Sequence, residues 1–115
     1  MEIINASKNL TTVQIYRLTR SPKTQKISDC VGQRLEVDAW CVYQDTDKKT
    51  GELKEVLTLS TPEGEVFGTN SPTFIESFMD MWEMFEQAGE TVHAVNVLTG
   101  TSKAGRTFVM CEYAD

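Results

Sequence analysis

The residues of this chain best suited to chemistry are flat aromatic rings and basic groups on short alternating segments. Tyr16 directly precedes Arg17. Arg106 stands two residues before Phe108, and Trp40 lies in an apolar run. Basic groups neutralise phosphates, and each base stacked on an aromatic ring contributes about 1–3 kcal/mol. Together these side chains indicate a surface that binds single-stranded nucleic acid.

Two segments with the alternation of β-strands would position Tyr16 and Trp40. Residues 13–18 (VQIYRL) alternate and are rich in strand-forming residues, which predicts a strand with Tyr16 facing outward. Residues 34–43 have the clearest strand pattern. Its core face is expected to consist of Leu35, Val37, Ala39, Cys41 and Tyr43. Trp40 is therefore expected on the outward face, although packing beneath a small extra hairpin that follows residues 53–60 is an alternative.

The remaining strands carry the other candidate residues. They are predicted at residues 53–60, 66–67, 91–98 and 106–113. Lys54 is expected on the outer face of its strand. Arg106 and Phe108 share one face of the last strand, where a core position for Phe108 is the alternative.

One helix is predicted, over residues 73–88. Thr73 and Glu76 have the spacing of a capping box, and Gly89 is placed to end the helix. Its apolar stripe consists of Phe74, Ile75, Phe78, Met79, Trp82 and Phe85, and its polar face carries Glu76, Asp80, Glu83 and Glu86. The stripe predicts a helix that plugs one end of a barrel.

This order of elements predicts a mainly β fold: a five-stranded OB-type barrel (β-β-β-α-β-β) with one capping helix and a small extra hairpin. The OB-fold is a partly open Greek-key barrel that binds oligonucleotides. Residues 1–115 are expected to form one OB-like domain. Ten residues are expected to contact nucleic acid: Tyr16, Arg17, Arg20, Arg34, Trp40, Lys48, Lys54, Lys103, Arg106 and Phe108.

The charge distribution permits a nucleic-acid partner despite a net charge of −6. Residues 1–34 carry six basic and two acidic side chains, whereas residues 35–115 carry five basic and fifteen acidic ones. One part of the chain can therefore form a cationic surface. The rim of this cationic surface is expected to carry Lys23, Lys26 and Lys49.

The sequence offers no support for catalysis, a metal or a cofactor. His93 is the only histidine, and Cys30, Cys41 and Cys111 lack the short spacing of zinc ligands, which favours reduced structural thiols. Residues 100–107 resemble a phosphate-binding P-loop, but a P-loop leads into a helix and this segment leads into a predicted strand. We expect a protein that is not an enzyme.

From about Val13 to Glu112 the sequence resembles the small single-stranded DNA-binding proteins of bacteriophages, particularly those of protein-primed Bacillus phages. The resemblance is carried by the segments VQIYRL, EGEVFGTNSPTF, VHAVNVL and GTSKAGRTF. It implies an OB-fold protein that coats and protects displaced strands during phage DNA replication, without sequence preference. It also implies that Tyr16, Trp40 and Phe108 stack on bases. The strongly acidic and aromatic helix departs from the family's more mixed composition.

Two other functions remain open. One is an acidic protein-interaction or inhibitor module whose helix carboxylates imitate DNA phosphates, and the other is an OB-like structural subunit that dimerises through an edge strand. Single-stranded DNA is the expected partner, with replication proteins as further candidates, no membrane, and a monomer or homodimer as the active form. The expected location is the cytoplasm, that of the host cell if a phage encodes the protein.

Overall fold

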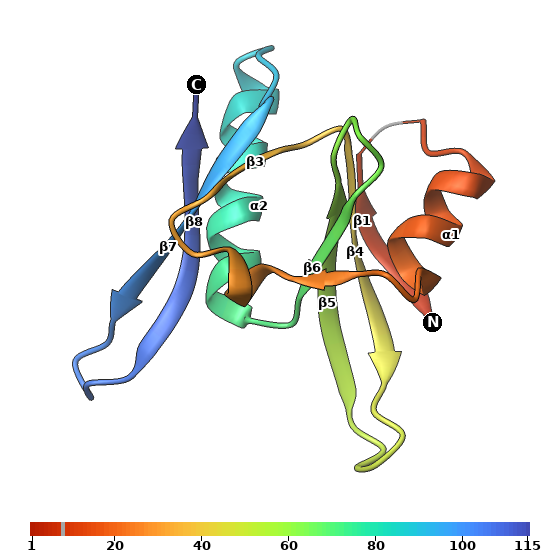
Figure 1. The fold of residues 1–115 in the computed structure, drawn as a ribbon, viewed down its shortest axis with the longest axis horizontal. Helices are drawn as coiled ribbons and strands as arrows, with labels where there is room; N and C mark the ends of the chain where they lie inside the picture. Colours follow the sequence, from red (N-terminus) through yellow and green to blue (C-terminus); the bar gives the residue numbers. More distant parts are fainter. Residues whose placement is uncertain (8) are drawn as a thin grey trace.

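The computed structural model describes residues 1–7 and 9–115, whose strands form two sheets (Figure 1). The larger sheet has the order β1-β4-β5-β6-β2, formed by Glu2–Ala6, Ala39–Thr46, Leu53–Ser60, Val66–Thr69 and Gln25–Lys26. The smaller sheet has the order β3-β7-β8, formed by Arg34–Glu36, Ala94–Thr101 and Thr107–Ala114. Helix α1 spans Thr12–Arg20, a 3₁₀ turn spans Ile27–Cys30, and α2 spans Pro72–Gln87. The predicted mainly β class is confirmed.

The two sheets are joined at a break between β3 and β4. The backbone N–H of Val37 donates to the carbonyl oxygen of His93, beside the smaller sheet, over 2.8 Å. The next N–H, that of Asp38, donates to the carbonyl oxygen of Ser60 in the larger sheet, also over 2.8 Å. The predicted strand 34–43 therefore exists as two strands that belong to different sheets.

The predicted five-stranded OB-type barrel with one capping helix and a small extra hairpin is confirmed only in part. The described residues form two helices and two separate sheets rather than one closed barrel. The segment at 66–69, predicted as part of an extra hairpin, is a full member of the larger sheet and pairs with both β5 and β2. Residues 2–6, for which no strand was predicted, pair with the free edge of β4.

Residues 13–18 are helical, so the strand predicted there is wrong. Thr11 and Gln14 form a reciprocal capping box, in which the Gln14 N–H donates to Thr11 Oγ1 and the Thr11 N–H donates to Gln14 Oε1. Leu18 is buried against β4 and β5. The cap and this packing outweigh the weak strand preference of the branched residues.

The core has two parts, one on each face of β4. The main core lies between the sheets and α2 and includes Trp40, Val42, Leu57, Leu59, Phe74, Phe78, Val95 and Val97. A smaller core under α1 consists of Leu18, Ala39, Cys41 and Tyr43. Because both faces of β4 are buried, alternation alone could not identify its outward face. The prediction that Trp40 points outward is wrong, since its side chain is only 1% exposed.

Helix α2 begins and ends one residue earlier than predicted, at Pro72 and Gln87. Ser71 is the N-cap, its hydroxyl accepting from the Phe74 N–H over 3.3 Å, and Pro72 occupies the first turn. The capping box predicted at Thr73 and Glu76 is therefore wrong. Gly89 follows the helix with φ of 73°, as its predicted role at the helix end requires. In the part of the chain that the structure describes, no helix is long and apolar enough to cross a membrane.

Candidate nucleic-acid interface

Helix α1 presents an exposed stripe of aromatic and basic side chains. The stripe consists of Val13, Tyr16, Arg17 and Arg20, which are spaced three or four residues apart and all exposed. Tyr16 is 59% exposed, so its predicted outward position is confirmed although a helix carries it. A ring open to solvent beside two guanidinium groups suits an unpaired base and its phosphates.

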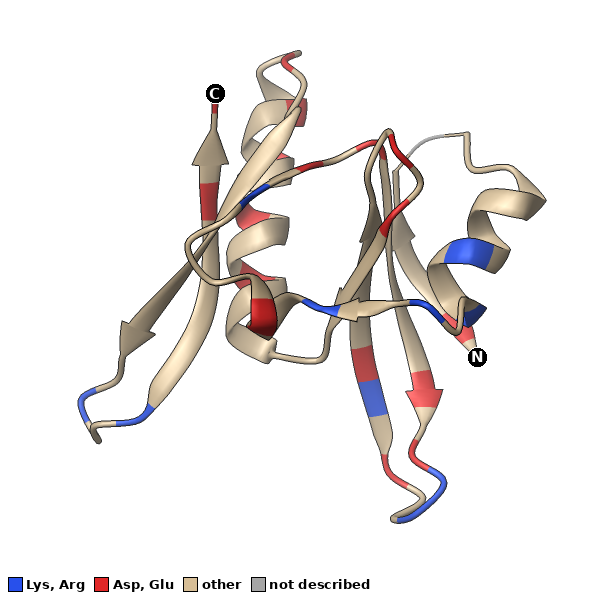
Figure 2. Ribbon diagram, viewed as in Figure 1, with Lys and Arg blue, Asp and Glu red and all other residues tan. Residues whose placement is uncertain are grey.

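The stripe continues into a segment without acidic residues, which we call the cationic segment. It covers residues 12–26 and contains Arg17, Arg20, Lys23 and Lys26. Its end, β2, pairs in parallel with β6, so that Lys26 lies opposite Gly68 at the edge of the larger sheet. Figure 2 shows these basic residues following one another from α1 to β2.

A groove of about 570 Å³ lies between the cationic segment and the outer face of the larger sheet. Its lining includes Thr19, Thr24, Lys26, Tyr43, Val56, Thr58, Gly68 and Asn70. Burial, with smaller contributions from Cys41 and Asp45, raises the pKa of the Tyr43 phenol, and Arg20 opposes the rise. The groove therefore combines a neutral phenol with hydroxyl groups and one lysine. The sequence pattern did not indicate Tyr43, because it placed that residue in the core.

Two hairpins carry further cations at one end of the molecule. The β4–β5 connection contains Lys48 and Lys49, and the β7–β8 connection contains Lys103. Arg106 closes the second turn, where its N–H donates to Ser102 Oγ over 3.2 Å. Both hairpins point toward the lower edge of Figure 2, with basic residues at their tips.

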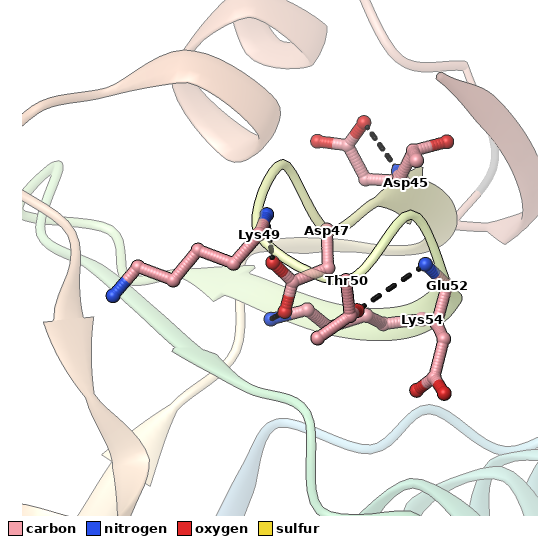
Figure 3. A network of polar contacts seen from close by, with 7 residues as sticks. Asp45, Asp47, Lys49, Thr50, Glu52 and Lys54 are labelled. Atoms are coloured by element: carbon pink, nitrogen blue, oxygen red, sulfur yellow. Dashed lines mark hydrogen bonds and ion pairs between the residues drawn. The ribbon is translucent and has the colours of Figure 1, made fainter.

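The lysine predicted on strand 53–60 is already paired within its hairpin (Figure 3). Lys54 Nζ lies 3.1 Å from Asp47 Oδ2, and the Lys49 N–H donates to Asp47 Oδ1 over 2.8 Å. The hydrogen bond from Lys49 and the interactions with Lys54 lower the pKa of the Asp47 carboxyl. Lys54 is thus exposed on the predicted face, but its charge is partly neutralised.

Phe108 lies on the outer face of the β7–β8 hairpin and is half-buried. Its register partner is Gly100. The opposite face of β8, where Cys111 is buried, belongs to the main core. The expectation of an outward ring therefore agrees with the structure better than a core position does.

Two predicted residues are poorly placed for a shared surface. Arg34 lies in β3 of the smaller sheet, where its Nε donates to the Asp115 carbonyl oxygen over 2.9 Å and its Nη1 lies 3.3 Å from Glu36 Oε1. Trp40 packs edge-on against Phe78, with ring centroids 5.3 Å apart, and has no free face for a base. The other eight residues are divided between α1 and the two hairpins.

The acidic residues of α2 are separated from the cationic segment by the larger sheet. Helix α1 covers one face of that sheet, and α2 lies on the other side with the smaller sheet (Figure 1). The exposed carboxylates of α2 are those of Glu76, Asp80, Glu83 and Glu86. This separation keeps the α2 carboxylates away from the cationic segment, and the acidic residues beside that segment include Glu63 and Glu65, which line a groove with Arg17 and Lys23.

The family model of the phage single-stranded DNA-binding protein, of the Phi29 type, matches residues 2–112. Neither the curated proteins nor the solved structures contain a significant match. Because the matched region spans nearly all 115 residues, the chain belongs to the Phi29-type family of phage single-stranded DNA-binding proteins.

Proposed function

We propose that this protein coats and protects single-stranded DNA during phage replication, largely without sequence preference and without catalysis. The observation that carries the proposal is the cationic segment, which has four basic and no acidic side chains in a chain of net charge −6. Such a segment attracts phosphates whatever the base sequence. The proposed place of action is the host cell cytoplasm.

The strand order supports a partly open OB-type barrel with added N-terminal elements. In this proposal β3 and β4 together correspond to the first strand of an OB-fold, interrupted by the break between them. This first strand is then followed along the chain by β5, β6, α2, β7 and β8. OB-folds bind oligonucleotides on their second and third strands and on the loops after the first and fourth. Here those parts are β5, β6 and the two hairpin connections. The groove and the cationic hairpin tips occupy these positions.

In this proposal the basic groups hold the backbone while exposed rings hold bases. Arg17, Arg20 and the lysines at the hairpin tips neutralise phosphates. Tyr16 and Phe108 provide stacking surfaces, and neither is fully buried. Trp40 and Arg34 are left out of the proposed site because other groups of the protein already engage them.

A binding comparison tests the proposal. Fluorescence anisotropy would measure binding to labelled oligonucleotides of about 20 nucleotides, longer than the roughly 4–16 that one OB-fold covers. Single-stranded DNA, duplex DNA and RNA of that length would be compared between about 50 and 200 mM salt. We expect single-stranded DNA to bind more tightly than duplex, with an affinity that falls steeply with salt. Absence of binding, or equal affinity for duplex DNA, would reject the proposal.

A second candidate function, docking of a basic partner on α2, is favoured by one observation. A groove of about 410 Å³ beside the end of α2 is lined by Trp82, Phe85 and Val92 together with Glu86 and Glu90. Aromatic rings next to carboxylates suit lysine or arginine side chains of a replication protein. If this docking surface is the functional one, the protein is an inhibitor module that acts without binding oligonucleotides.

The double variant Glu86→Gln/Glu90→Gln separates the two functions. If the protein coats DNA, the variant keeps its affinity for single-stranded DNA, while any docking of a replication protein weakens. If the carboxylates alone carry the function, wild-type protein binds no oligonucleotide.

A further inference from the structure

Gly100 stands inside β7 without a backbone reason for a glycine. Its φ is not positive, and it pairs with Phe108 in the regular β7–β8 ladder. A glycine in a strand interior destabilises the strand relative to alanine. Some contact at this position must therefore require the absence of a side chain.

That contact is the ring of Phe108. A Cβ atom added to Gly100 would lie 2.6 Å from Phe108 Cζ and 2.7 Å from its Cε2. The far end of the ring thus lies over the bare backbone of β7. Phe108 is half-buried rather than buried, so the residue keeps part of its surface exposed.

The turn next to this ring is held in a defined shape and carries two cations. The Ser102 N–H donates to the Arg106 carbonyl oxygen over 2.8 Å, and the Gly105 N–H donates to the Ser102 carbonyl oxygen over 2.9 Å. Gly105 has φ of 81°, which allows the tight turn. Lys103 and Arg106 therefore belong to a turn of defined backbone shape that leads directly into β8, the strand that carries Phe108.

We propose that Gly100 is a positioning residue, which lets Phe108 lie across β7 as a platform for one base beside the phosphate-binding turn. The inference rests on the proposed function, because the ligand is the same single-stranded DNA. A purely structural role, in which the ring only covers a bare glycine, predicts the same packing but no preference for bases.

The test compares oligo-dT with an abasic oligonucleotide of equal length, which has the same phosphates but no bases. Wild-type protein is expected to prefer oligo-dT. Phe108→Leu keeps an apolar cover but removes the aromatic face, and should reduce this preference about 5- to 150-fold, as expected for one stacked base. The salt dependence of binding should not change, and Phe108→Tyr should restore the preference. The matched control is Tyr113→Leu, which removes a ring stacked on Phe85 on the opposite face of β8 and should leave the preference unchanged.

Gly100→Ala should weaken the preference for oligo-dT with the salt dependence intact, because the new methyl group displaces the ring. It should also lower the melting temperature in the wild-type background but not in a Phe108→Ala background. An equal loss in both backgrounds would overturn the role of Gly100, and an unchanged preference in Phe108→Leu would overturn the platform. If wild-type protein binds no single-stranded DNA, the proposed function fails. If it binds oligo-dT and abasic oligonucleotides equally, the Phe108 platform and base stacking on Tyr16 both fail, whereas coating of single-stranded DNA through its phosphates stands.

Discussion

The indole ring of Trp40 packs edge-on against that of Trp82, with ring centroids 5.1 Å apart. Phe78 stacks on Trp82 at 5.7 Å, so the three rings form one cluster between β4 and α2. Trp40 Nε1 has no hydrogen-bond partner among the described residues. A buried donor without a partner costs about 1–3 kcal/mol, so the cluster must be stabilised by packing.

This cluster predicts that Trp40 affects folding rather than DNA binding. Trp40→Ala is expected to lower the free energy of unfolding by about 3–5 kcal/mol, because it leaves a large cavity. Trp40→Phe should cost less, since it keeps part of the ring contacts and removes the unpaired N–H. Denaturant unfolding measures both effects. Folded Trp40→Phe protein should bind single-stranded DNA with wild-type affinity, and a marked loss of affinity would contradict the assignment.

The start of α2 gives a second prediction, with its control two residues away. Ser71→Ala should lower the free energy of unfolding by about 1 kcal/mol, because it removes the acceptor for the Phe74 N–H. Thr73→Ala lies within the first turn and should have little effect. Thermal unfolding compares the two variants. If the larger loss occurs in Thr73→Ala, the cap lies where the sequence pattern placed it.

The ion pair between Lys54 and Asp47 leads to a variant with increased affinity. Asp47→Asn keeps an acceptor for the Lys49 N–H but releases Lys54 for phosphate. The affinity for single-stranded DNA should rise, and its salt dependence should become steeper by about 0.7 in log–log slope, as for one added phosphate contact. Glu52→Gln is the matched control, because it removes one carboxylate charge from the same hairpin, and Glu52 forms no ion pair with a lysine among the described residues. Equal effects of the two substitutions would mean that Lys54 does not contact DNA.

The lowered pKa of Asp47 predicts how the hairpin responds to acid. The folded pKa lies below the unfolded value of about 3.9, so the stabilisation is complete above that value and is lost as the pH falls through the folded pKa. The difference in unfolding free energy between wild type and Asp47→Asn should therefore shrink as the pH is lowered through this range. The chemical shift of the Lys49 amide should report the same titration. A difference that does not depend on pH would show that the carboxylate does not stabilise the fold.

The sequence predicted those elements whose burial follows one simple pattern. The stripe from Phe74 to Phe85 identified α2, and alternation identified the strands at 53–60 and near the C-terminus. It failed in β4, because Trp40 and Cys41 point to opposite faces and both are buried. The prediction also failed in α1, a short helix that is stabilised by the Thr11 cap and by burial of Leu18. The strand preference of the branched residues in this segment is visible in the sequence, whereas the contribution of these two contacts is not.

The sequence predicted which residues the candidate site contains better than it predicted how these residues are arranged and paired. Tyr16, Arg17 and Arg20 are exposed as expected, because they lie on α1 away from Leu18, the residue that the helix buries. The pairing of Lys54 with Asp47 depends on the shape of a turn, and that of Arg34 with Asp115 joins distant parts of the chain. Contacts of this kind appear only once the chain is folded.

The salt dependence of oligo-dT binding, measured for wild-type protein and for Arg17→Ala/Arg20→Ala/Lys23→Ala, tests the cationic segment most directly. Each lost phosphate contact makes the log–log slope shallower by about 0.7, so the triple variant should bind more weakly with a slope shallower by about 2. Arg34→Ala, whose arginine is held by Glu36 and the Asp115 carbonyl oxygen, should keep the wild-type slope. A folded triple variant with the wild-type slope and affinity would contradict the assignment of this surface to DNA.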